Sequence, residues 1–256
     1  MGLGEMNFLM NKPVAHLGLL VVFEGIDGSG KSSVSKWVID ELVSKEFRAT
    51  YLFEPTRDGY GATIRDRMVY DLENFSVEEQ ASLFVLNRAQ NKSKKIIPNL
   101  RQSKVVILDR YYYSSIAYQA ATGKFSPETI YNFNKPVIMT PDIVIMFDVD
   151  VDKALARIKA NRESSTDYEK KDFLEKAQTI YRSMKAFNIH TIDANQSYEK
   201  VCSDALNLVY FAIDRKNEMF TKYNASTNKI PRDKESNVED FDSLWEVLYK
   251  EAYNIK

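Results

Sequence analysis

The sequence has few residues of the types that build disulfides and metal clusters. Cys202 is its only cysteine, which excludes an internal disulfide framework and a cysteine-based zinc site. The two histidines, His16 and His190, argue against a histidine metal cluster. Positive and negative charges nearly balance, because the sequence has 35 lysines and arginines and 36 aspartates and glutamates. The net charge of −1 gives no global attraction to nucleic acid, so we expect no nucleic-acid partner.

Long apolar runs are also missing. The longest one near the start, Leu17–Phe23, is far too short to span a bilayer. Residues 1–18 contain one lysine and no small-residue cleavage site, so they do not resemble a signal peptide. We therefore expect a cytoplasmic protein with no membrane partner.

Five short apolar runs, rich in β-branched residues, alternate with helical patterns along the chain. Each run is continuous, as expected for strands that are covered on both faces. Strands alternating with helices predict an α/β fold, a doubly wound parallel sheet of about five strands flanked by helices. The predicted strands are Leu19–Phe23, Ala49–Phe53, Val105–Leu108, Ile143–Phe147 and Ile189–Ile192, and further helical patterns cover roughly 76–102, 151–163, 170–186 and 197–216.

The two ends of the chain depart from this alternation. Residues 1–18 predict an N-terminal extension to a main domain over residues 19–213. Residues 214–256 predict an appendage, in which the polar stretch 217–238 forms a loop and about 239–254 form a last helix with one apolar face.

A glycine-rich stretch directly follows the first predicted strand. From Gly25 to Ser32 the chain fits the pattern G-x-x-x-x-G-K-[ST] of the phosphate loop (P-loop) of nucleotide triphosphatases. Glycines let backbone N–H groups surround phosphate oxygens, and the following helix N-terminus adds a positive field. In this pattern Lys31 reaches the β- and γ-phosphates, and the Ser32 hydroxyl ligates Mg²⁺. The predicted ATP-binding residues here are Gly25, Gly28, Ser29, Gly30, Lys31, Ser32 and Ser33.

A second strand end carries Asp109 followed by Arg110. The carboxylate is placed to hold Mg²⁺ or one of its waters, and an ordinary ion pair at a strand end is the alternative. Several arginines (Arg57, Arg65, Arg88 and Arg110) fall near the predicted rim. They suit the second polar site that a kinase needs beside its triphosphate site.

Four motifs together resemble the thymidylate kinase family. They are Phe23-Glu-Gly-Ile-Asp-Gly-Ser-Gly-Lys-Ser32, Phe53-Glu-Pro-Thr-Arg57, Leu83-Phe-Val-Leu-Asn-Arg88 and Asp109-Arg-Tyr-Tyr-Tyr-Ser-Ser-Ile-Ala-Tyr-Gln119. The resemblance runs from about residue 19 to 212. It implies a nucleoside monophosphate kinase domain over 19–213 with a mobile lid over about 157–170. The implied reaction transfers the γ-phosphoryl group of ATP to thymidine monophosphate (dTMP) in dTTP biosynthesis, and the implied assembly is a homodimer.

The resemblance also implies roles for single residues. Asp27 matches a loop carboxylate near the transferring phosphate, although a capping aspartate in a turn is the alternative. Arg57 and Arg110 match the arginines that grip the acceptor's phosphate. Phe84 matches a ring that stacks on thymine, unless it is a core residue, and Arg88 an arginine on the base's carbonyl edge. The other implied dTMP-binding residues are Glu54, Pro55, Ser115, Tyr118, Gln119 and Tyr168, with the Tyr118 ring leaving little room for a 2′-hydroxyl.

Phosphoryl transfer needs a cation at the transferring group, and this phosphate loop has no arginine. The resemblance therefore implies that the lid supplies it. Arg162 is the first choice, and Arg157 is expected along the adenine. The residue before Tyr168 is often basic in relatives but is Asp167 here. The implied catalytic residues are thus Lys31, Asp27, Arg110 and Arg162, and the implied metal-binding residues are Ser32 and Asp109.

Two alternatives stay open at this stage. A P-loop deoxynucleoside kinase would phosphorylate a 5′-hydroxyl and need a general base, for which Glu54 is available. The presence of Arg57 and Arg110 argues against it, because a nucleoside has no phosphate to bind. A non-catalytic nucleotide-binding protein, docking through its last helix, would bind ATP without forming ADP.

Overall fold

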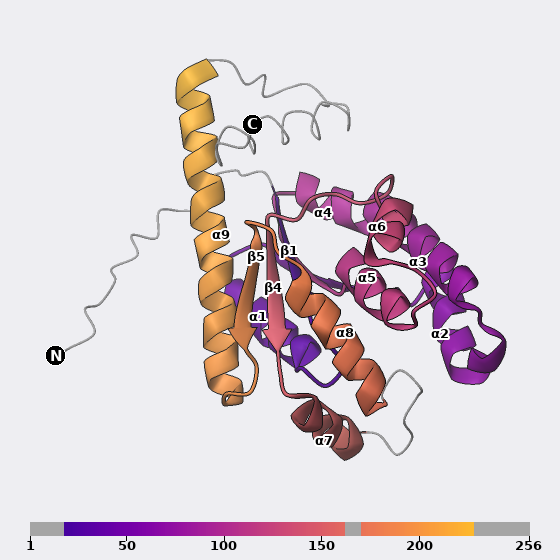
Figure 1. Cartoon of the computed structure of the whole chain (residues 1–256). Helices are drawn as coiled ribbons and strands as arrows, with labels where there is room; N and C mark the ends of the chain where they lie inside the picture. Colours follow the sequence, from indigo (N-terminus) through magenta and orange to yellow (C-terminus); the bar gives the residue numbers. More distant parts are fainter. Residues whose placement is uncertain (1–17, 162–169, 228–256) are drawn as a thin grey trace. The chain divides into compact units, whose positions relative to one another are not determined.

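The computed structural model describes residues 18–161 and 170–227, and its elements follow the predicted alternation of strands and helices (Figure 1). The strands are β1 (Leu19–Glu24), β2 (Ala49–Phe53), β3 (Val105–Asp109), β4 (Ile143–Asp148) and β5 (Ile189–Asp193). The helices are α1 (Lys31–Ser44), α2 (Tyr60–Tyr70), η1 (Leu72–Asn74), α3 (Val77–Asn91), η2 (Lys92–Ile96), α4 (Ile97–Arg101), α5 (Tyr112–Ala121), α6 (Pro127–Asn134), α7 (Val151–Asn161), α8 (Lys171–Ser183) and α9 (Tyr198–Thr227).

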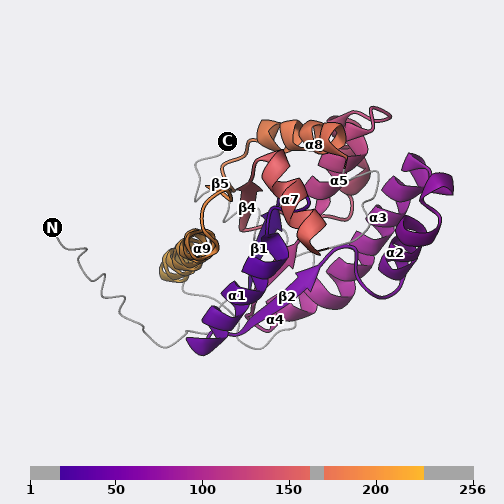
Figure 2. The ribbon, with the colours of Figure 1, turned by 90° about the horizontal axis from the view of Figure 1, so that it is seen from below.

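The five strands form one parallel sheet in the order β2-β3-β1-β4-β5, which confirms the predicted fold class. Figure 2 shows α1 on one face of this sheet and α5 and α8 on the other. Val21 and Val22 of β1 are completely buried, as are Ile107 and Leu108 of β3. Burial on both faces explains why these strands have continuous rather than alternating apolar sequences.

The register of the strands brings three strand ends to one edge. Phe23 of β1 and Phe53 of β2 both pair with Asp109 at the end of β3. The segments that follow these strands therefore begin side by side. In open parallel sheets, ligands bind beyond the carboxyl ends of the strands, so this edge is where a site is expected.

The C-terminal prediction needs a correction. The loop predicted from residue 217 is wrong as far as Thr227, because α9 continues to that residue and passes through the expected boundary at 213. No glycine or proline occurs between Tyr198 and Thr227, so a polar composition alone did not end the helix. Residues 1–17 and the last helix predicted over 239–254 lie outside the described residues.

The chain divides into two compact units between Val209 and Tyr210. The sheet and the site described below belong to the first unit. Although α9 has 30 residues, neither it nor any other helix within 18–161 and 170–227 is long and apolar enough to cross a membrane.

Candidate active site

The phosphate loop joins β1 to α1 and depends on its glycines. Gly28 has a φ of +78°, and a Cβ on it would lie 2.3 Å from the carbonyl oxygen of Ala154 in α7. Lys31 is buried, and its Nζ donates to the Ile26 carbonyl at 2.7 Å and to Ser29 Oγ at 3.0 Å. Burial lowers the pKa of Lys31 to about 8. The Lys31 ammonium group thus donates to oxygen atoms of the loop itself, and the phosphate oxygens of a nucleotide can replace these acceptors.

Asp109 faces the first turn of α1 from the end of β3. Its Oδ2 accepts hydrogen bonds from Ser32 Oγ at 2.5 Å and from the Tyr51 hydroxyl at 2.9 Å. Its Oδ1 is buried and has no hydrogen-bond partner.

This arrangement fits Mg²⁺, which takes few protein oxygens and keeps several waters. A serine hydroxyl and an unpartnered carboxylate oxygen lie together at the head of α1, where Ser32 and Asp109 were expected to hold the ion. In the described part of the chain, no group of three or more His, Cys, Asp or Glu side chains could hold a metal ion elsewhere.

Asp27 and Arg110 connect the phosphate loop with the segment after β3. Arg110 Nη2 donates to Asp27 Oδ1 at 2.7 Å. The Tyr118 hydroxyl donates to Asp27 Oδ2 and accepts from the Asp27 backbone N–H, both at 2.9 Å. Desolvation raises the pKa of Asp27, but the charges of Arg110 and Lys31 outweigh it and lower that pKa overall. Three residues predicted separately from the sequence therefore form one charged cluster.

A second, buried cluster surrounds Arg88 of α3, which is 1% exposed. Its Nε and Nη2 lie 2.9 and 2.8 Å from Glu54 Oε2. Its Nη1 donates to Asn134 Oδ1 of α6, and its Nη2 donates to Ser115 Oγ of α5 at 3.2 Å. Asn91 donates to the other Glu54 oxygen at 3.1 Å. Burial raises the pKa of Glu54, opposed by Arg88 and Asn91. Three partners, Glu54, Asn134 and Ser115, thus hold the guanidinium in place.

Phe84 and Gln119 lie on the helices that hold this cluster. Phe84 precedes Arg88 by one helical turn on α3 and is half-buried. Gln119 of α5 is 3% exposed, and its Oε1 has no hydrogen-bond partner. A buried amide oxygen without a partner is a group that a ligand can satisfy.

The segment after β2 presents two arginines around one ring. The guanidinium carbons of Arg57 and Arg65 lie 5.6 and 5.3 Å from the Phe53 ring centroid. Arg65 also donates to the Pro55 carbonyl, whereas the Arg57 side chain lies at the exposed rim. Arg57 is therefore accessible to an anion, and Arg65 supports the backbone of the segment.

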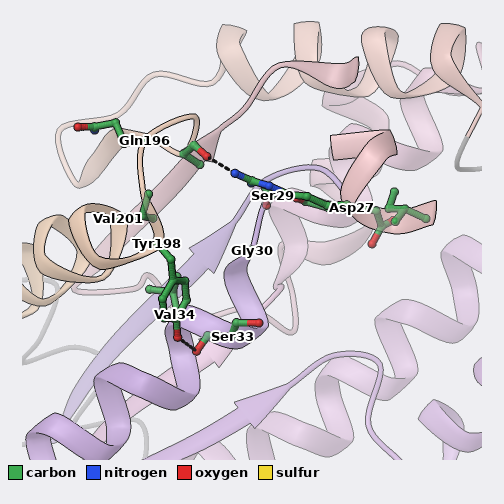
Figure 3. Close-up of a pocket in the computed structure, with 12 residues that line it drawn as sticks. Asp27, Ser29, Gly30, Ser33, Val34, Gln196, Tyr198 and Val201 are labelled. Carbon is green, nitrogen blue, oxygen red and sulfur yellow. Dashed lines mark hydrogen bonds between the residues drawn. The ribbon is translucent and has the colours of Figure 1, made fainter. Parts of the chain in front are cut away.

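A cavity of about 660 Å³ opens beside the phosphate loop (Figure 3). Arg157 of α7 donates to the Gly28 carbonyl at 3.4 Å and to the Ala194 carbonyl at 3.0 Å. On the side of α1, the Tyr198 hydroxyl donates to the Ser33 carbonyl at 3.3 Å, as Figure 3 shows. A planar guanidinium and a phenol ring thus border the space next to the loop. The cavity is lined by Asp27, Gly28, Ser29, Gly30, Ser33, Val34, Arg157, Ile158, Ala194, Gln196, Tyr198 and Val201.

Some residues that the structure brings into contact with the site escaped the sequence analysis, and two predicted site residues lie outside the described residues. Tyr51 and Tyr198 had no pattern that marked them, since one lies inside an apolar run and the other begins a helix. Glu24 had a signal, because it is a carboxylate at the end of an otherwise apolar strand. Arg162 and Tyr168 fall in the part of the chain that the structure does not describe.

Comparison with known proteins adds an independent finding. A family model described as thymidylate kinase matches residues 23–205, which include the phosphate loop and both clusters. The thymidylate kinase of Brachyspira hyodysenteriae is 38% identical over 192 residues, which cover 75% of this chain and 93% of that protein. The thymidylate kinase of Desulfotalea psychrophila is 37% identical over 190 residues (74% and 93%), and that of Akkermansia muciniphila is 38% identical over 186 residues (73% and 88%).

Proposed function

This chain belongs to the thymidylate kinase family, and from that premise we propose how its residues transfer the γ-phosphoryl group of ATP to dTMP. The products are dTDP and ADP, in the biosynthesis of dTTP. The observation that carries the assignment of roles is the contact between Asp27 and Arg110 at 2.7 Å. It joins the phosphate loop to the segment that holds the acceptor's phosphate, and it marks the point of transfer.

The donor side uses the loop and the cavity beside it. Backbone N–H groups of residues 25–33 surround the phosphates, and Lys31 turns from its internal acceptors to the β- and γ-phosphates. Arg157 lies along the adenine. Ser32 and Asp109 would hold Mg²⁺, which when bound would supply charge neutralisation at the phosphates.

The acceptor side uses the two clusters. Arg110 and Arg57 bind the phosphate of dTMP, because a guanidinium offers paired donors to a phosphate. Phe84 stacks on thymine, and Arg88, Ser115 and Gln119 meet its polar edge. Tyr118 borders the deoxyribose of dTMP, and Glu54 and Pro55 form part of the wall of the dTMP pocket. We assign Arg162 to the transferring group and Tyr168 to the acceptor; both residues lie outside the described part of the chain.

No general base is required in this scheme. The acceptor phosphate is already anionic at neutral pH, so positioning and charge neutralisation supply the catalysis. Glu54, the base that a deoxynucleoside kinase would need, is 3% exposed and is bound by Arg88 and Asn91. A carboxylate held in this way is poorly placed to accept a proton from a 5′-hydroxyl.

We further propose that the protein is a cytoplasmic homodimer and that its kinase activity requires Mg²⁺. Sedimentation of the full chain at micromolar concentration would report the mass of the assembly. A single species of monomer mass would contradict the dimer without affecting the assigned reaction.

The reaction is tested by following ADP release from Mg·ATP with dTMP, with thymidine, with other nucleoside monophosphates and with no acceptor. We expect release largely confined to dTMP. Release with thymidine instead would assign the chain to the deoxynucleoside kinases. ATP binding without ADP release on any acceptor would identify a non-catalytic nucleotide-binding protein.

A further inference from the structure

Glu24, the last residue of β1, is a carboxylate with no exposed surface. Its Oε1 accepts hydrogen bonds from the backbone N–H groups of Tyr111 at 2.6 Å and of Ser114 at 3.2 Å. Its Oε2 accepts from Ser114 Oγ at 2.6 Å and from the Tyr181 hydroxyl of α8 at 3.0 Å. One buried side chain therefore binds the start of α5 and, through Tyr181, the helix α8. No role assigned above uses it.

Ser114 links this carboxylate to Arg110. The Ser114 hydroxyl has one hydrogen, and the 2.6 Å contact with Glu24 uses it. Its lone pairs are then left for Arg110 Nη1, which donates to Ser114 Oγ at 2.9 Å, and for the Tyr181 hydroxyl, which lies 2.8 Å from that oxygen. The Glu24 carboxylate can only accept, so it sets the direction of both hydrogen bonds: Arg110 donates to Ser114, and Ser114 donates to Glu24.

The backbone of Arg110 adds a second reason for this support. Its φ is +69°, a conformation that is unfavourable for a residue with a side chain. The next peptide N–H, that of Tyr111, donates to Glu24. The carboxylate therefore stabilises the turn in which Arg110 adopts this conformation, as well as the hydroxyl that orients its guanidinium.

We propose that Glu24 is a positioning residue, which acts through Ser114 to hold the Arg110 guanidinium in the orientation that binds the acceptor's phosphate. This inference rests on the proposed function, since it takes Arg110 as a ligand of that phosphate. Glu24 itself touches no substrate.

The test compares binding of dTMP with binding of thymidine, which lacks the phosphate, by calorimetry. For Glu24→Gln we expect dTMP to bind about tenfold more weakly, the size of one charge-assisted hydrogen bond, while thymidine binding changes less than twofold. Ser114→Ala should have the same selective effect. The double variant should lose clearly less than the two single effects combined, because both changes interrupt the path through the Ser114 hydroxyl.

Tyr112→Phe is the matched control. It removes a hydroxyl from a residue of the same helix that is 8% exposed and whose hydroxyl partner is Tyr113. It should leave the difference between dTMP and thymidine binding unchanged. If Glu24→Gln does not fold, Ser114→Ala and Tyr181→Phe carry the test, because both leave the carboxylate in place.

Equal weakening of dTMP and thymidine by Glu24→Gln would overturn the inference, since it would indicate general damage to the pocket. Additive effects of the two changes would also overturn it, because Glu24 would then not act through Ser114. A wild-type protein that binds thymidine as tightly as dTMP would instead contradict the proposed function.

Discussion

Arg110 donates to Asp27 at 2.7 Å across a sequence separation of 83 residues. The same guanidinium donates through its other terminal nitrogen to Ser114 and lies 5.2 Å from the Tyr118 ring centroid. These contacts on several sides hold the Arg110 guanidinium in one orientation. A planar group with fixed donor directions suits this task, whereas an ammonium on a flexible stem does not.

Replacing Arg110 with lysine should therefore cost activity although the charge is kept. An ammonium cannot contact Asp27, Ser114 and a phosphate in the same directions, so we expect kcat/KM for dTMP to fall by about 100-fold. The KM for ATP should change less than threefold. Steady-state kinetics of Arg110→Lys measure both, with the exposed Arg101→Lys of α4 as the control. An equal loss toward ATP and dTMP would contradict an acceptor role for Arg110.

The pH dependence of kcat/KM should reflect the titration of the dTMP phosphate rather than that of Asp27 or Arg110. The pKa of Asp27 is lowered, so the carboxylate is already charged at pH 5 and above. Burial lowers the pKa of Arg110, but Asp27 more than compensates and raises it overall, so the guanidinium also stays charged. A phosphate monoester, by contrast, loses its second proton at about pH 6. We expect log(kcat/KM) for dTMP to rise with a slope of one up to about pH 6 and then to level off until Lys31, whose pKa is about 8, begins to lose its charge.

Asp27→Asn distinguishes the two origins of that acidic limb. It should lower the plateau and leave the limb at the same pH. A limb that moves or disappears in Asp27→Asn would assign the titration to the protein instead.

The strands and the phosphate loop could be predicted because their signals are local. A continuous run such as Val105–Leu108 indicates a strand covered on both faces, and the glycine pattern before Lys31 needs no distant partner. Both signals are properties of a few neighbouring residues, and the structure confirms the parallel sheet they predicted.

The parts that could not be predicted depend on long-range contacts. Helix α5 begins with Tyr112 and Tyr113, which are weak helix formers, and Glu24 accepts from the N–H groups of its N-cap residue Tyr111 and of Ser114, 87 and 90 residues later in the chain. The motif around Arg88 gave no sign that Asn134, 46 residues later, would hold its guanidinium. Such partners are fixed only once the sheet has brought distant segments together.

The contact between Tyr51 and Asp109 leads to a prediction about Mg²⁺ binding. Its hydroxyl donates to Asp109 Oδ2 at 2.9 Å, and the unpartnered Oδ1 is the oxygen left for Mg²⁺. Without this bond Asp109 keeps only its contact with Ser32, so Tyr51→Phe should raise the Mg²⁺ concentration needed for half-maximal rate by about tenfold, the size of one charge-assisted hydrogen bond. The readouts are Mg²⁺ titration of the rate and Mn²⁺ binding to the ADP complex by electron paramagnetic resonance, with Tyr131→Phe as the control. Unchanged Mn²⁺ binding would show that Ser32 alone orients Asp109.

Glu54 provides a last prediction, because two roles for it give opposite results. Its carboxylate forms a buried ion pair with Arg88 at 2.8 Å, with both side chains 1% exposed. Removing one partner of such a pair leaves an uncompensated buried charge, which typically costs 3–5 kcal/mol. Glu54→Gln keeps the shape and should lower the free energy of unfolding by about 3 kcal/mol in urea titrations. The exposed Glu73→Gln should leave it unchanged.

A second pair of variants separates stability from chemistry. Replacing both Glu54 and Arg88 with leucine removes both charges, so most of the lost stability should return. The double variant should nevertheless bind dTMP poorly, because the base has lost Arg88. If Glu54 were a general base, Glu54→Gln would instead abolish turnover with thymidine while the free energy of unfolding stayed near that of the wild type. The two measurements on one variant therefore decide between a carboxylate that holds an arginine and a carboxylate that accepts a proton.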